Sequence, residues 1–183
     1  MEIGKFVCPE QFAHLGHGLK LNPCPACHRV GTLNLHGFLR GFNEKHHPTV
    51  RARRIFCSNR TRRPGCGRTF SVFLSHCLVG LRMGTDLAWA FFSAVLAGLS
   101  VEKSFYARFA RHALSLSTFW RLWQKLISSQ TTLRTVLLTV SPPPIGAFTS
   151  PLRETLAHLA LAFGTRGENP LENYQLLTQK FLV

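Results

Sequence analysis

The sequence predicts a small α+β protein: an N-terminal zinc ribbon of three short antiparallel strands, followed by an all-α, helix-turn-helix-like bundle. Two cysteine pairs, Cys24/Cys27 and Cys57/Cys66, lie in a segment rich in Arg, His, Gly and Pro. Residues 72–140 are instead apolar, with few charges, and from residue 85 they follow a helical period. We therefore divide the chain into a zinc-ribbon domain with an N-terminal cap (1–74), a helical domain (75–140) and a Pro-rich linker with C-terminal helices (141–183).

The four cysteines Cys24, Cys27, Cys57 and Cys66 are the predicted ligands of one structural Zn²⁺ ion. Four thiolates close a zinc tetrahedron to water, and a segment with so little apolar content needs such a cross-link to fold. The second pair is unusual, because eight residues separate Cys57 from Cys66 where two are common. Other side chains therefore stay open as ligands, either replacing a thiolate or forming a second site: Cys8, His14, His17, His28, His76 and Cys77.

Alternating apolar residues predict the strands of the ribbon. The first strand is marked by Val30, Leu33, Leu35 and Phe38, and the second by Val50, Ile55 and Phe56. The polar, breaker-rich segment 41–48 predicts the loop between them. Residues 69–73 predict a third strand that leaves the second cysteine turn.

From residue 85 the pattern predicts a series of helices. Thr85-Asp86 is expected to cap a helix that ends near Ala97, and Ser100 to cap a second over 101–113. Ser117 is expected to cap a third over 118–128, and a further helix over 131–140 ends before the prolines at 142–144. Ser150-Pro151 and Asn169-Pro170 each open a C-terminal helix, ending near Phe163 and Phe181.

The charge balance predicts a polyanionic partner. The chain carries 22 Lys and Arg against 8 Asp and Glu, with a formal net charge of +14. Arginine predominates, which favours contacts to phosphates and base edges. An acidic membrane surface and an acidic protein remain the alternatives. The predicted phosphate-binding surface is a run of arginines with no acidic residue between Glu44 and Asp86: Arg51, Arg53, Arg54, Arg60, Arg62, Arg63 and Arg68.

Catalysis is not expected from this composition. Strand transfer by a metal-dependent nuclease needs clustered carboxylates, whereas this chain has one aspartate and seven scattered glutamates. The N-terminus lacks the apolar segment of a signal peptide, and the apolar run 87–99 is too short for a membrane span. We therefore expect a cytoplasmic, nucleoid-associated protein without a membrane partner.

The order of these parts resembles zinc-ribbon plus helix-turn-helix DNA-binding proteins of prokaryotic insertion sequences and transposons. The resemblance covers roughly residues 20–130 and rests on CPAC, GCGRTFSV, GLSVEKSF and LSLSTFWRLWQKL. Such proteins are leader proteins of insertion sequences or N-terminal regions of transposases, and they bind element ends. The resemblance implies metal ligation by the four cysteines, and base or backbone contacts from the helix that carries Thr118, Arg121 and Lys125.

The expected function is that of a zinc-dependent, non-catalytic DNA-binding factor in transposition or its regulation. Expected partners are nucleic acid, DNA rather than RNA, and a transposase or recombinase. The C-terminal helices are expected either to pack on the bundle or to form the contact of a homodimer. Two alternatives stay open. One is an RNA-binding or ribonucleoprotein module that stacks single-stranded bases on ribbon aromatics, and the other is a scaffold that docks a partner recombinase.

Overall fold

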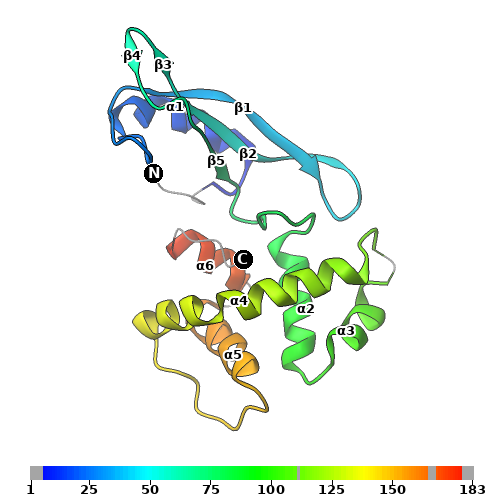
Figure 1. Cartoon of the computed structure of the whole chain (residues 1–183). Helices are drawn as coiled ribbons and strands as arrows, with labels where there is room; N and C mark the ends of the chain where they lie inside the picture. Colours follow the sequence, from blue (N-terminus) through cyan, green and yellow to red (C-terminus); the bar gives the residue numbers. More distant parts are fainter. Residues whose placement is uncertain (1–5, 111, 165–167, 179–183) are drawn as a thin grey trace. The chain divides into compact units, whose positions relative to one another are not determined.

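The chain folds into two compact units, which are described separately. Unit 1 comprises Met1–Gly41 and Pro48–Ser75, and unit 2 comprises Phe42–His47 and His76–Val183. The computed structural model describes residues 6–110, 112–164 and 168–178, with only the backbone described at residue 63. Figure 1 shows a sheet in unit 1 and helices in unit 2, which confirms the predicted α+β class.

Unit 1 is built on a three-stranded antiparallel sheet. Strands β1 (Leu33–Phe42), β2 (Pro48–Cys57) and β5 (Thr69–Phe73) lie in the order β1-β2-β5. β2 pairs with β5 so that Ala52 lies opposite Phe73 and Phe56 opposite Thr69. The three predicted strands are therefore present, but Val30 lies outside β1. The left-handed conformation of Gly31 (φ 80°) turns the chain just before the strand begins.

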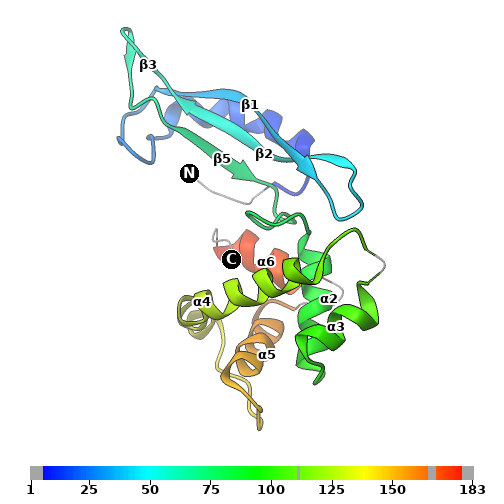
Figure 2. The same ribbon diagram turned by 45° about the vertical axis from the view of Figure 1, so that its right-hand side comes forward.

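Short N-terminal helices lie beside the sheet in unit 1 (Figures 1 and 2). They are η1 (Pro9–His14), α1 (Leu15–Gly18) and η2 (Leu19–Leu21). Phe12 is the buried anchor of this segment, with its ring centroid 5.3 Å from that of Phe6 and 6.3 Å from that of Phe38. The N-terminal segment therefore contributes to the small apolar core of unit 1.

The long interval between Cys57 and Cys66 forms a second, two-stranded sheet. β3 (Asn59–Arg60) pairs with β4 (Arg63–Pro64), with Asn59 opposite Pro64 and Arg60 opposite Arg63. Figures 1 and 2 show this hairpin projecting beyond the end of the three-stranded sheet. The extra residues therefore fold on themselves, outside the line of the main strands.

Unit 2 contains five helices among its described residues. They are α2 (Thr85–Leu96), α3 (Val101–Arg108), α4 (Leu116–Val140), α5 (Pro151–Phe163) and α6 (Pro170–Thr178). Two predicted caps are confirmed: the Oγ of Ser100 accepts from the N–H of Lys103 at 3.2 Å, and that of Ser150 accepts from the N–H of Arg153 at 3.3 Å. None of the helices described is both long and apolar enough to cross a membrane.

The prediction of separate helices over 118–128 and 131–140 was wrong, because α4 runs through both. Leu126, Leu133 and Leu137 are all buried and lie at intervals of seven and four residues. One apolar stripe thus continues across residues 129–130, which contain no helix breaker. The predicted cap at Ser117 was also wrong: the N-cap is Ser115, whose carbonyl accepts from the N–H of Thr118 at 2.9 Å.

Two further boundaries differ from the prediction. The N-cap of α2 is Gly84, so Thr85 is the first helical residue and not the cap. α3 ends at Arg108 and not near residue 113, because Phe109 leaves helical geometry (φ −121°, ψ −3°) and its side chain is buried in the core. The predicted end of the last helix, near Phe181, lies outside the described residues.

The five helices share one apolar core. Phe91 of α2 and Phe119 of α4 have ring centroids 5.1 Å apart, and Phe109 stacks on Phe119 at 4.9 Å. Leu156 of α5 and Leu171 of α6 are fully buried in the same cluster. The C-terminal helices are therefore part of the bundle core.

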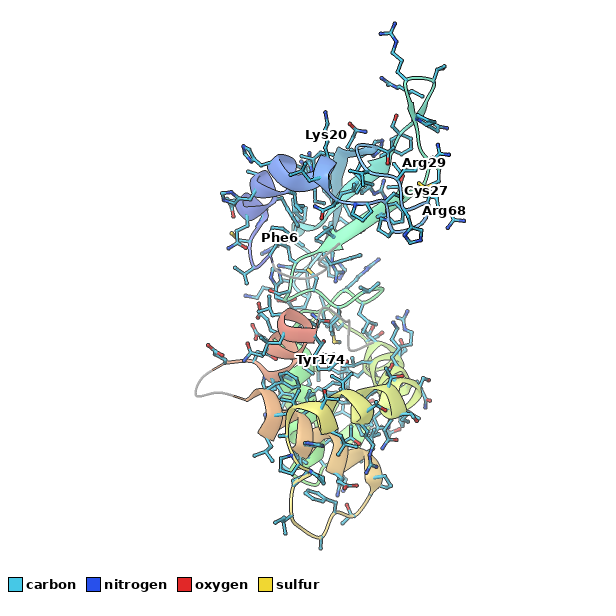
Figure 3. All side chains as sticks on the ribbon, turned by 90° about the vertical axis from the view of Figure 1, so that its left-hand side faces the viewer. Phe6, Lys20, Cys27, Arg29, Arg68 and Tyr174 are labelled. Carbon is cyan, nitrogen blue, oxygen red and sulfur yellow. The ribbon has the colours of Figure 1, made fainter. Side chains whose placement is uncertain are left out.

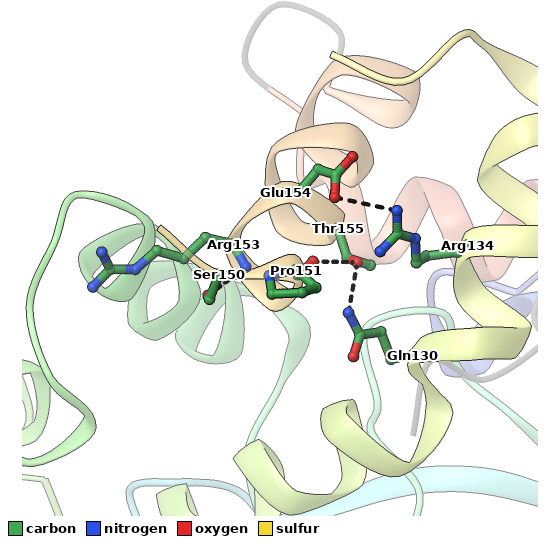
Figure 4. Close-up of polar contacts among 7 residues, drawn as sticks. All are labelled: Gln130, Arg134, Ser150, Pro151, Arg153, Glu154 and Thr155. Carbon is green, nitrogen blue, oxygen red and sulfur yellow. Dashed lines mark hydrogen bonds and ion pairs between the residues drawn. The ribbon is translucent and has the colours of Figure 1, made fainter. Parts of the chain in front are cut away.

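Polar contacts between α4 and α5 add to this packing (Figure 4). Arg134 Nη2 lies 3.1 Å from Glu154 Oε2, and Gln130 Nε2 donates to Thr155 Oγ1 at 3.2 Å. The ion pair is 41% and 31% exposed, so it contributes at most about 1 kcal/mol. The apolar stripe of α4 therefore dominates the stability of this helix pair.

Candidate metal centre and its basic surface

The structure brings the four predicted cysteine ligands together in unit 1. The Sγ atoms of Cys24, Cys27, Cys57 and Cys66 all lie within 4.8 Å of one another. The Sγ atoms of Cys24 and Cys66 are 3.7 Å apart, and those of Cys27 and Cys57 are 3.8 Å apart. These separations exceed the S–S bond length of about 2.05 Å, and all four thiols are free. The four cysteines could hold one metal ion.

The two cysteine turns close in the same way despite their different spacing. The N–H of Cys24 donates to the carbonyl of Arg29 at 2.9 Å, and the N–H of Cys57 donates to the carbonyl of Arg68, also at 2.9 Å. In each turn the acceptor follows the second cysteine by two positions. The intervening residue is left-handed in both, His28 with φ 57° and Gly67 with φ 72°. The backbone therefore presents both cysteine pairs in equivalent geometry.

Backbone N–H groups and one hydroxyl group lie against the sulfurs of Cys24 and Cys57. The N–H of Ala26 donates to Cys24 Sγ at 3.4 Å, and the N–H of Cys66 donates to Cys57 Sγ at 3.3 Å. The hydroxyl oxygen of Thr32, a buried residue, lies 3.3 Å from Cys57 Sγ. At Cys57 these contacts lower the pKa of the thiol and so favour the ionised form that binds a cation.

The pKa values within the cluster move in opposite directions. Burial raises the pKa of the Cys57 thiol, but hydrogen bonds with the Thr32 hydroxyl, the N–H of Cys66 and the thiols of Cys24 and Cys66 together outweigh it and lower that pKa to about 6. The N–H of Arg68 lowers the pKa of Cys66, but burial and the neighbouring sulfurs raise it to about 11. The sulfurs do not all ionise together unless a cation compensates their charge.

Gly65 is required by the closure of the second turn. A Cβ at this position would collide with Cys57 Sγ and with the carbonyl oxygen of Ser58. The N–H of Gly65 also donates to that Ser58 carbonyl at 2.5 Å. The glycine therefore allows the hairpin to return directly against the Cys57 sulfur.

The alternative ligands left open by the sequence are outside this cluster. Among the described residues, the four cysteines are the only group of His, Cys, Asp or Glu side chains placed to hold a metal ion. Within the cluster, Cys24 and Cys57 are fully buried and Cys66 is exposed. The residues that do not join it are Cys8, His14, His17, His28, His76 and Cys77.

The predicted arginine surface is divided between half-buried and exposed positions. Arg51 and Arg53 are half-buried, and the Arg53 guanidinium carbon lies 4.2 Å from the centroid of the Phe38 ring. The side chain of Arg63 lies outside the described part of the structure. The arginines of the predicted set whose side chains are exposed are Arg54, Arg60, Arg62 and Arg68.

One further arginine joins this surface. Arg29, which the sequence had not singled out, is exposed, and its Nη1 donates to the carbonyl of Pro64 in β4. Figure 3 labels Arg29 and Arg68, the residues that accept from Cys24 and Cys57, together with Cys27. We call Arg29, Arg60, Arg62 and Arg68 the basic rim of the metal centre.

The predicted contact residues of the helical unit have different environments. Thr118 is buried, and its Oγ1 lies 3.3 Å from Ser115 Oγ. Lys125 is half-buried and its Nζ donates to the carbonyl of Val79 at 3.3 Å. Arg121 is exposed on α4. The structure therefore leaves Arg121 as the most accessible of the three.

The positive charge is concentrated in unit 1. Its described residues include ten Lys and Arg but one acidic residue, Glu10. The described residues of unit 2 include eight Lys and Arg and six acidic residues. The net charge of the chain therefore belongs mainly to the unit that carries the cysteine cluster.

Some site residues had no signal in the sequence. Thr32 and Arg29 become neighbours of the cluster only through the folded turns, and a lone Thr or Arg near a cysteine is too common to be informative. His36 lies on β1 with its ring centroid 6.1 Å from that of Phe56 on β2. Cross-strand register alone brings that pair together.

Comparison of the chain with protein-family models, with curated proteins and with solved structures found no match.

Proposed function

We propose that the protein is a zinc-stabilised nucleic-acid-binding protein, in which a structural ion holds the fold of unit 1 and the basic rim contacts phosphates. The observation that carries the proposal is the position of Arg29, Arg60, Arg62 and Arg68 on the turns and hairpin that close the cysteine cluster. These arginines are presented by backbone that the cysteines fix. Metal binding and polyanion binding would thus depend on the same local fold.

Zinc is the proposed metal because of the donor set and its spacing. A Zn–S bond of about 2.3 Å places tetrahedral sulfurs about 3.8 Å apart. The measured separations of 3.7 and 3.8 Å support that geometry. Four thiolate ligands leave no coordination position for a substrate, so the proposed role of the ion is structural. Together with the three-stranded sheet, this supports the zinc-ribbon assignment.

Unit 1 carries more positive charge than the metal centre needs to balance its own negative charge. Zn²⁺ with four thiolates carries a net charge of about −2. The described residues of unit 1 include ten Lys and Arg against one acidic residue, so a large positive excess remains. Exposed guanidinium groups form bidentate contacts with phosphate oxygens. A nucleic-acid backbone is the polyanion that best matches this dense arginine surface.

The proposed biological role follows the resemblance to transposable-element proteins. The protein would bind DNA at element ends, without catalysing strand transfer, and either regulate transposition or position a recombinase. α4, with Arg121 exposed, would supply the contacts of a helix-turn-helix reader. An RNA-binding module remains the second candidate, supported by the aromatic pair His36 and Phe56 on the sheet.

The proposal is tested by the salt dependence of binding. We expect the full chain to bind a short duplex with an affinity that falls steeply with salt concentration. A variant with Arg60→Ala and Arg62→Ala should lower the slope of log K against log[salt] by about 2, since each lost phosphate contact removes about 0.9. Fluorescence anisotropy over a range of salt concentrations measures this slope.

Arg108→Ala provides the matched control, because Arg108 is an exposed arginine in unit 2. We expect it to leave the slope nearly unchanged. The absence of any duplex or single-strand binding by the unmodified chain at low salt would reject the proposed function. A loss of slope per arginine removed that is the same in both variants would show instead that only total charge matters and that the basic rim has no special role.

A further inference from the structure

A pocket of about 460 Å³ lies in unit 1, between residues of β1, the end of β2 and the β3–β4 hairpin. Its size is within the range of about 300–1,000 Å³ that is typical of small-molecule sites. No feature of the metal centre accounts for it. The pocket combines aromatic, neutral polar and basic side chains, and its lining residues are Asn34, Leu35, His36, Phe56, Ser58, Arg60 and Arg62.

His36 and Phe56 give this pocket an aromatic surface. His36 is exposed and Phe56 is half-buried, and their rings are inclined by 44° with centroids 6.1 Å apart. A planar base between two rings would need a separation of about 7 Å, because each stacked contact takes about 3.5 Å. The pair therefore cannot sandwich a base, but it offers one ring face for stacking and a second ring at the edge.

Hydrogen-bonding groups lie beside the aromatic pair. Asn34 uses Nδ2 to donate to the carbonyl of Thr32 at 3.0 Å, which leaves its side-chain oxygen as an acceptor. Ser58 Oγ accepts from the N–H of Arg60 at 3.4 Å, so its hydroxyl proton remains as a donor. One acceptor and one donor suit the polar edge of a nucleobase.

Arg60 and Arg62 place positive charge on the hairpin side of the pocket. Both are exposed, and Arg62 also lines a second hollow of about 520 Å³ together with Arg29 and Val30. The hairpin arginine is therefore shared by two neighbouring hollows. A strand whose base entered the aromatic pocket would carry its phosphates across Arg62 toward Arg29.

We propose that this pocket receives an unpaired nucleobase of a single-stranded nucleic acid segment, with the Phe56 ring stacking on the base, His36 at the edge of the base, and Arg60 and Arg62 contacting the adjacent phosphates. The inference rests on the proposed function and narrows its substrate class. Bases inside a duplex are stacked on their neighbours, so their faces cannot reach a side-chain ring, whereas unpaired bases can.

The test compares single-stranded with duplex ligands, using the full zinc-loaded chain. The probes are a dT₁₂ strand, a U₁₂ strand and a 12-base-pair duplex, each measured by fluorescence anisotropy at the same salt concentration. Phe56→Leu keeps an apolar side chain but removes the ring. We expect it to weaken single-strand binding roughly 5- to 150-fold, the range for loss of one stacked base, and duplex binding by less than twofold.

Phe42→Leu is the matched control, because Phe42 is an exposed aromatic of β1 that does not line the pocket. We expect Phe42→Leu to cause no selective loss of single-strand binding relative to duplex binding. Since Phe56 precedes a metal ligand, metal content and melting temperature are measured for each variant. His36→Ala changes an exposed side chain, so it tests the pocket independently if Phe56→Leu does not fold. We expect His36→Ala to weaken single-strand binding selectively as well.

The outcomes separate this inference from the proposed function. If the unmodified chain binds nucleic acid but neither His36→Ala nor a folded Phe56→Leu selectively weakens single-strand binding, the pocket proposal is wrong and the proposed function stands. If the unmodified chain binds neither duplex nor single strands, both are wrong. Selective loss with dT₁₂ and U₁₂ alike supports a base-and-phosphate site common to DNA and RNA. A loss confined to one strand supports the site and identifies that strand's chemistry.

Discussion

The N–H of Cys66 donates a hydrogen bond to the Sγ of Cys57 at 3.3 Å, across nine positions of the sequence. The eight residues between the two cysteines form the β3–β4 hairpin, so their number does not separate the sulfurs. The unusual spacing of Cys57 and Cys66 in the sequence is thus compatible with a compact cluster of sulfurs. The same insertion carries Arg60 and Arg62 of the basic rim.

Removal of one cysteine should release the metal and unfold unit 1. We expect Cys24→Ser to reduce bound zinc from one ion per chain to near zero, because binding free energies of about 10–16 kcal/mol for structural zinc are coupled to folding. Elemental analysis of the purified protein and thermal melting measure the two effects. Cys8→Ser is the control, since Cys8 is outside the cluster, and it should retain the ion. Zinc retention by Cys24→Ser would contradict the four-cysteine site.

Gly65→Ala should disturb the second cysteine turn. The added Cβ would meet Cys57 Sγ and the Ser58 carbonyl, and such overpacking costs about 1–3 kcal/mol. We expect a lower melting temperature and weaker zinc retention against a chelator.

Gly37→Ala is the control for this change, because Gly37 lies in β1 and an added Cβ would meet no atom within 4 Å. Its free energy of unfolding should change by no more than about 0.5 kcal/mol. Equal effects of the two substitutions would show that the close approach at Gly65 does not constrain the metal turn.

Adjacent leucines of α4 test whether the helix is continuous through its C-terminal half. Leu137 is fully buried, so Leu137→Ala should destabilise unit 2 by about 2–5 kcal/mol. Leu138 is 59% exposed, and Leu138→Ala should change the free energy of unfolding by no more than about 0.5 kcal/mol. Urea unfolding measures both. Similar effects would be inconsistent with the buried stripe that runs from Leu126 to Leu137.

Arg121 and Lys125 should have different roles on α4. Arg121 is exposed, so Arg121→Ala should leave stability unchanged and, if α4 reads DNA, relax the preference among bound sequences. Lys125 donates to the carbonyl of Val79, so Lys125→Ala should lower stability by about 0.5–1.5 kcal/mol. Selection of bound sequences from a random DNA pool, combined with thermal melting, distinguishes them. An unchanged sequence preference with Arg121→Ala would contradict its contact with bases.

The strands and the first pair of candidate metal ligands could be predicted because their signals are local. Cys24 and Cys27 belong to one turn, and alternating apolar residues placed β1, β2 and β5. The caps at Ser100 and Ser150 were predictable for the same reason, because a serine side chain satisfies a backbone N–H only three residues away.

Helix continuity was less accessible from the sequence. The predicted helices 118–128 and 131–140 are separated by residues 129–130, which lie in a Ser/Thr-rich segment, 128–132, of weak helix propensity. Burial of Leu126 and Leu133 on one core overrides that propensity. The end of α3 was likewise set by Phe109, which leaves the helix and is buried in the core. In both cases packing decided the boundary.

The sequence by itself determined that the chain is α+β, that four cysteines are candidate ligands and that arginine is concentrated in residues 51–68. Only the tertiary structure decided that Cys57 and Cys66 share a cluster, that the C-terminal helices join the bundle core, and that His36 and Phe56 meet beside Arg60 and Arg62. The physical reason is the range of the interactions. Residue spacing and periodicity reflect contacts between residues that are close in the sequence. The closure of the second cysteine turn, the register of the strands and the packing of the core depend on contacts between distant segments.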